Sequence, residues 1–203
     1  MKLPKVEFVY SSVYDDMRRT NPSFIKKLNK IKDRYPSQKE VLSYKRAIEK
    51  EWKKRGKKIL REMSKIMNLP WKEDKIKCYI IGRGRSFSDP LTVRIYKDKS
   101  KFIDTLTHEL IHQLQIQNSE RMKKWWKYVA KKYKDEAQLT RRHIFLHAVH
   151  SQLYKRIFKE KRLKRDIEES KQSLDYKKAW DIVEKEVDTT IIKRFKKIVF
   201  GNK

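Results

Sequence analysis

Residues 105–114 read TLTHELIHQL and carry one charge, Glu109, in a chain of which 39% is Asp, Glu, Lys or Arg. Leucine and isoleucine recur there at helical spacing, which predicts a buried helix over residues 100–116. Residues four apart lie on the same face of a helix, so His108 and His112 point the same way with Glu109 beside them. A carboxylate buried at such a place is costly unless another group pairs with it.

The pattern H-E-x-x-H on a helix is typical of catalytic zinc sites. Zinc binds histidine nitrogens at about 2.0–2.1 Å, and a catalytic site keeps an open position for water. The ion lowers the pKa of that water, and a nearby carboxylate takes its proton and passes it to the leaving group. We therefore predict a Zn²⁺ site with His108 and His112 as metal ligands and Glu109 as the catalytic general base. The alternative is a structural helix with surface histidines.

The histidines are confined to one part of the chain, at His108, His112, His143, His147 and His150. The last three are spaced by four and three residues, which places them on one face of a second helix. A third ligand from this later helix would complete the site. His147 is the first choice, because it lies between the other two; His143 is the second choice and His150 the third. Carboxylates that could replace them are Glu120 and Glu136.

The rest of the pattern predicts an α+β, helix-dominated fold with a short β-sheet. Strands are expected at 6–13, 76–81 and 91–96, and helices at 24–34, 38–67, 100–116, 121–133 and 141–160, with an amphipathic pattern over 176–200. Asn21-Pro22-Ser23 and Ser37 with Glu40 are the expected helix starts. At 203 residues we expect one compact unit made of an N-terminal strand and helical segment (1–70), a catalytic core (71–160) and a C-terminal helical extension (161–203).

The stretch TLTHELIHQL resembles the active-site helix of the zincin metallopeptidases. A strand just before it, LTVRIY, and a third ligand on a later helix are similar to the gluzincin and minigluzincin arrangement, over residues 76–158. The resemblance implies a small zincin-like domain that hydrolyses peptide bonds with a zinc-bound water and Glu109. It also implies that segment 91–96 binds extended substrate by β-augmentation.

The third ligand departs from that pattern, because gluzincins use Glu and this chain offers His. A histidine at this position resembles the SprT-like proteases that act on DNA-bound proteins, as does the aromatic helix at 125–133, although their histidine follows the motif sooner. The resemblance therefore implies the catalytic chemistry of the zincins. It identifies the substrate only as a peptide or protein.

Charge provides a rival prediction. Lys and Arg total 54 against 26 Asp and Glu, a net charge of +28, which favours contact with nucleic acid or another polyanion. The rival function is a basic nucleic-acid-binding protein whose zinc site is structural or degenerate; a protease acting on DNA-associated proteins would combine both functions. Three segments could bind a polyanion, and the run at 50–61 is the best candidate. The aromatic residues of 121–133 are best explained as core residues, and the loop at 82–86 lacks a phosphate-binding pattern.

Cys78 is the only cysteine, which excludes an intramolecular disulfide and a zinc site with several cysteines. The sequence shows neither a signal peptide nor an apolar stretch long enough to span a membrane, so we expect a cytoplasmic protein with no membrane contact. The abundance of Lys and Glu is also thermophile-like.

Overall fold

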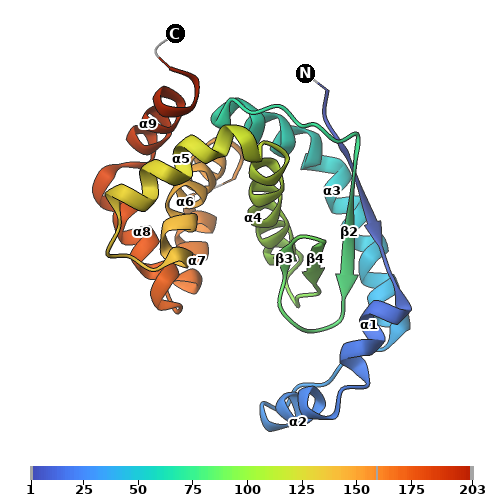
Figure 1. The fold of residues 1–203 in the computed structure, drawn as a ribbon. Coiled ribbons are helices and arrows are strands. Elements are labelled where there is room, and N and C mark those ends of the chain that lie inside the picture. Colours follow the sequence, from blue (N-terminus) through green and yellow to red (C-terminus); the bar gives the residue numbers. More distant parts are fainter. Residues whose placement is uncertain (1, 159, 202–203) are drawn as a thin grey trace. The chain divides into compact units, whose positions relative to one another are not determined.

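A computed structural model describes residues 2–158 and 160–201 (Figure 1). The described residues form nine helices and a four-stranded mixed sheet, which confirms the predicted helix-dominated α+β fold class. The chain divides into two compact units, each built from stretches that are distant in sequence. The predicted segments 1–70, 71–160 and 161–203 stay a prediction.

The unit that contains the sheet consists of Leu3–Lys57 and Glu73–Gln113. Its strands are β1 (Lys5–Val9), β2 (Lys75–Ile81), β3 (Phe87–Ser88) and β4 (Leu91–Arg94), in the order β1-β2-β4-β3. The pairs β1–β2 and β2–β4 are parallel, and β3 is antiparallel to β4. The two predicted strands around the loop are therefore present, and the loop itself contributes the short strand β3.

Helices α3 (Gln38–Met67) and α4 (Lys99–Gln117) cover one face of this sheet with aromatic side chains. The ring of Phe8 on β1 lies 6.3 Å from that of Trp52 and 6.2 Å from that of Phe102. Because side chains alternate along a strand, Val6 and Phe8 are buried while Lys5 is exposed. This contact sets the motif helix α4 against the sheet.

The predicted strand at 6–13 is wrong beyond Val9, because a helix start follows it. Ser11 accepts a hydrogen bond from the Tyr14 amide at 3.3 Å and caps α1 (Ser12–Arg19). Helix α2 (Pro22–Lys30) begins where the sequence predicted, with the Asn21 side chain accepting from the Phe24 amide at 2.9 Å. A side-chain cap satisfies an amide that has no partner inside the helix.

Helix α3 spans the predicted range of 38–67. At its start the Ser37 amide donates to Glu40 at 2.7 Å, and the Glu40 amide donates to the Ser37 hydroxyl at 3.3 Å, which is the expected capping box. Gly56 does not interrupt the helix. A Cβ atom at this position would lie 2.4 Å from the Trp52 ring, so glycine leaves room for that side chain.

The loop after β2 is held by two acidic residues from far away in the sequence. The Gly82 amide donates to the buried carboxylate of Asp15 at 2.8 Å. Arg83 donates to both oxygens of Asp33, at 2.7 and 3.0 Å. Of the two arginines in this loop, Arg83 is thus paired and Arg85 is exposed.

The second unit contains the ends of α3 and α4 and five further helices: α5 (Ser119–Lys132), α6 (Gln138–Ile157), α7 (Glu160–Ser170), α8 (Leu174–Glu186) and α9 (Asp188–Phe200). Trp125 of α5 is fully buried, with its ring 5.4 Å from Phe145 and 5.5 Å from Phe195. This confirms the interpretation of Trp125 as a core residue. The amphipathic pattern over 176–200 runs through two helices, which are separated at Val187.

Candidate functional site

The motif residues lie in the middle of α4, as the sequence predicted. Asp98 precedes the helix and accepts from the Ser100 amide at 2.8 Å, which fixes the helix start and the register of the motif. The rings of His108 and His112 lie 5.2 Å apart between centroids, at an interplanar angle of 70°. Both histidines are half-buried, so a ligand can reach the two imidazoles from one side of the helix.

Glu109 is buried, with 8% of its surface exposed. Burial raises the pKa of Glu109 to about 8, because the charged form loses contact with water. Cys78 of β2 lies close enough to Glu109 for the two groups to interact. Burial is the main cause that raises the pKa of the Cys78 thiol, and the negative charge of Glu109 raises it further. A carboxylate kept in this apolar setting by the sheet is a group whose protonation changes near neutral pH.

Two hydrogen bonds connect α4 to β3 and to the segment that follows β4. The side-chain amide of Gln113 donates to the carbonyl of Ser88 on β3, and Thr105 donates to the Tyr96 hydroxyl at 3.1 Å. They bind the helix on both sides of His108 and His112. The orientation of the motif is thus set by polar contacts in addition to apolar packing.

Strand β4 does not have the open edge that the predicted β-augmentation at 91–96 needs. It pairs with β2 on one side and with β3 on the other, through Phe87–Thr92 and Ser88–Leu91. The Arg94 amide also donates to the Ser86 hydroxyl at 3.2 Å. The edge on this side of the sheet therefore belongs to β3.

Helix α6 carries the other three histidines, all buried on one face. The Nδ1 atom of His143 lies 2.8 Å from the carbonyl oxygen of Leu139, one turn earlier. A carbonyl only accepts, so Nδ1 holds the proton and Nε2 is the lone-pair nitrogen of the ring. Burial lowers the pKa of His143, which favours the neutral form that binds metals. The ring of Tyr176 on α8 packs 4.4 Å from it.

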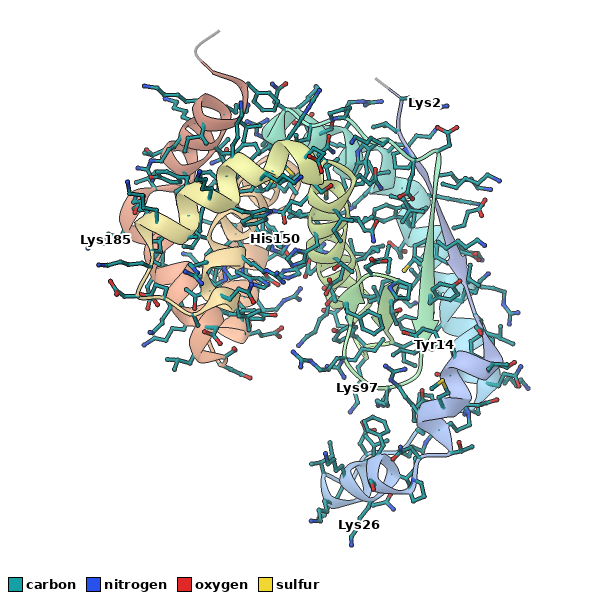
Figure 2. The ribbon with its side chains drawn as sticks, viewed as in Figure 1. Lys2, Tyr14, Lys26, Lys97, His150 and Lys185 are labelled. Carbon is teal, nitrogen blue, oxygen red and sulfur yellow. The ribbon has the colours of Figure 1, made fainter. Side chains whose placement is uncertain are left out.

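His147 and His150 have different surroundings. The ring of His147 stacks on Trp180 of α8 at a centroid distance of 4.3 Å and an interplanar angle of 18°. His150, labelled in Figure 2, lies 3.4 Å from a carboxylate oxygen of Asp166 on α7, and its ring makes an edge contact with Tyr154 at 4.6 Å. Both rings are embedded among side chains of their own unit.

His108 and His112 belong to the unit that contains the sheet, and the three histidines of α6 belong to the second unit. Of the candidate third ligands, His143 (the second choice) has its proton held on Nδ1 by Leu139, whereas the ring of His147 (the first choice) is stacked on Trp180. Three imidazoles are a donor set that suits zinc. With His143 held by Leu139, the ring has the hydrogen bond to a backbone carbonyl that metal-bound histidines commonly make.

The remaining candidates make other contacts. Glu136 lies 3.2 Å from Lys178, and the exposed Glu120 lies 2.8 Å from Lys123. The sequence pattern did not identify Tyr176 and Trp180 as residues that touch the histidines. Their spacing of four on α8 was the available signal, since it places two aromatic rings on one face of a helix.

Comparison with protein-family models, with curated proteins and with solved structures finds no match to this chain. Within the described residues, no helix is both long enough and apolar enough to cross a membrane.

Proposed function

We propose that this chain is a zinc-dependent metallopeptidase of the zincin type, with His108, His112 and His143 as metal ligands and Glu109 as general base. The observation that carries the proposal is the buried carboxylate of Glu109 next to two imidazoles on one face of α4. A fold gains no stability from an acid buried among apolar residues, so chemistry is the better explanation for it.

The donor set supports zinc as the metal. His143 presents Nε2 because its Nδ1–H donates to Leu139, and burial favours its neutral form. The three imidazoles would hold the ion, and water would complete its ligands. When bound, zinc supplies Lewis acidity, which lowers the pKa of a water molecule towards neutrality and polarises a peptide carbonyl.

The role proposed for Glu109 follows from its place on the helix. It is adjacent to His108 in sequence, so its carboxylate can take a proton from water held at the site and deliver it to the amine that leaves. The apolar surroundings favour a return to the neutral acid, as the raised pKa of about 8 indicates. Gln113 and Thr105 keep the helix aligned while this proton moves. Strand β4 takes no part in substrate pairing in this proposal.

The first experiment compares wild type, Glu109→Gln and His112→Ala for bound zinc and for cleavage of casein. Glu109→Gln should keep about one zinc per chain and lose activity by about 10²–10⁴-fold, the usual contribution of a general base. His112→Ala should lose both metal and activity. Glu120→Gln, an exposed carboxylate outside the site, is the matched control and should retain both. Absence of zinc from wild type, or full activity in Glu109→Gln, would disprove the proposal.

A second pair of variants tests the third ligand. His143→Phe and His147→Phe both keep an aromatic ring and remove the ring nitrogens. His143→Phe should weaken zinc binding by at least about 100-fold, as expected when a ligand is removed. His147→Phe should keep zinc, because a phenyl ring preserves the stack on Trp180. Zinc lost from His147→Phe alone would assign the ligand to His147 instead.

A further inference from the structure

The outer face of α3 carries a row of basic side chains within the unit that contains the sheet. With 3.6 residues per turn, these side chains fall within about 60° of one another around the helix axis and extend over about 27 Å. We call this row the basic stripe. Its members, all exposed, are Lys39, Arg46, Lys50, Lys53 and Lys57.

The basic stripe is not neutralised by the fold. Other lysines of the same helix have acidic partners: Lys45 lies 2.8 Å from Glu49, and Lys54 lies 2.8 Å from Glu51. Across residues 2–158 and 160–201, no ion pair involves a member of the basic stripe. Arg46, Lys50, Lys53 and Lys57 follow one another at spacings of four, three and four, where like charges repel. Helix stability therefore does not explain the arrangement.

A groove beside the basic stripe adds one more basic group from another element. It has a volume of about 540 Å³ and is lined by Arg46, Lys50, Lys54 and Lys99, with Glu51 and Ser43. Lys99 is the first residue of α4, so two helices contribute positive charge to the same groove. The groove thus places basic side chains of two helices around a space that a phosphate group could enter.

The composition of this surface indicates which polyanion it fits. The apolar face of α3 is already buried in the fold through Val41, Ile48 and Trp52, so the helix has no apolar face to insert into a lipid surface. The stripe also has no aromatic side chain on which unpaired bases could stack. A straight row of about 27 Å matches about eight base pairs of duplex at 3.4 Å each.

We propose that the basic stripe and its groove bind the phosphate backbone of double-stranded nucleic acid without reading its sequence. The binding surface uses residues of α3 and the start of α4 and none of the histidines. It does not rest on the proposed peptidase activity. If the chain is also a peptidase, this surface would hold the enzyme next to proteins that are bound to the same duplex.

The test measures binding of the full chain to a fluorescent 20-base-pair DNA duplex by anisotropy, over a series of salt concentrations. The variant Lys50→Gln/Lys53→Gln/Lys57→Gln removes three stripe charges and keeps residues that favour helix. The control Lys26→Gln/Lys27→Gln/Lys30→Gln removes three exposed charges from α2 in the same unit. The stripe variant should bind at least about tenfold more weakly, and its salt slope should fall by about three, one for each phosphate that is no longer neutralised.

The control variant should bind within about threefold of wild type, because it changes net charge without touching the stripe. Equal losses in the two triple variants would overturn the proposal, since net charge alone would then explain binding. Tighter binding of a single-stranded oligonucleotide, or of phosphatidylserine vesicles, would also overturn it. Cleavage of a short uncharged peptide by the stripe variant should equal that of wild type, which separates this result from failure of the peptidase proposal.

Discussion

His143, His147 and His150 share one face of α6 and differ in what surrounds each ring. A carbonyl of the same helix fixes the proton of His143 on Nδ1, an indole stacks on His147, and a carboxylate lies next to His150. These are a ring with its lone pair on Nε2, a ring packed on an indole and a ring beside a carboxylate. Identical residues three and four positions apart thus have different surroundings, because α7 and α8 bring a different side chain to each ring.

Glu186 provides a test of electrostatics at a single residue. Burial by itself would raise its pKa, but hydrogen bonds from Arg194, Lys132 and Tyr133 lower it to about 2. Lys132 lies 2.7 Å away and the Tyr133 hydroxyl 2.8 Å. Because the folded pKa is below the ordinary value of 4.5, the stabilisation is complete above that value and is lost as pH falls towards 2.

We therefore expect Glu186→Gln to lower the free energy of unfolding by about 1–2 kcal/mol at pH 7, the usual effect of losing hydrogen bonds to charged groups. The difference from wild type should shrink at pH 3.5. Urea unfolding at both pH values measures it. Glu120→Gln, which removes an exposed pair, should change stability by less than about 0.5 kcal/mol at either pH. A difference for Glu186→Gln that grows on acidification would contradict the assignment.

At the scale of elements, the boundary between α8 and α9 depends on an unusual backbone conformation. Val187 has a φ of 66°, a region that β-branched residues rarely adopt, and its side chain is 53% exposed. The chain turns there, and Asp188 then starts α9 while accepting hydrogen bonds from Ser151 at 2.6 Å and Lys155 at 2.7 Å. The contacts of Asp188 with α6 hold the strained residue in place.

Val187→Gly should raise the free energy of unfolding by about 1 kcal/mol. Relief of about 1–3 kcal/mol of strain exceeds the roughly 0.5–1 kcal/mol that glycine loses in conformational entropy. Thermal and urea unfolding measure the change. Ala130→Gly, at an exposed position in the last turn of α5, is the control and should destabilise by up to about 1 kcal/mol. Similar destabilisation by both variants would show that the backbone at Val187 is not strained.

At the scale of the whole molecule, a net charge of +28 acts against folding through self-repulsion. Salt screens charges over about 8–10 Å at physiological strength, so the folded state should become more stable as salt is added. The melting temperature should rise between 20 and 300 mM NaCl, by about 2–4 °C for each kcal/mol of repulsion removed. Calorimetry measures it. A melting temperature that falls with salt would mean that the ion pairs outweigh the repulsion.

The sequence predicted the features that depend on nearby residues. The start of α3 follows from Ser37 and Glu40, the start of α2 from Asn21, and the register of His108, Glu109 and His112 from the spacing of apolar residues. Caps and helical periodicity act within one or two turns, so the local sequence holds all the information that they need. The helix-dominated α+β class follows from the same local signals.

Tertiary structure decided the features that depend on residues far apart. The pairing of β4 with both β2 and β3, the bond of Arg83 to Asp33 and the packing of Tyr176 and Trp180 on the histidines all join distant stretches. The sequence determined that three histidines share one face of α6. Helical periodicity alone does not distinguish one of these histidines from another. Only the folded chain separates them, because the environment of a side chain depends on which other elements pack against it.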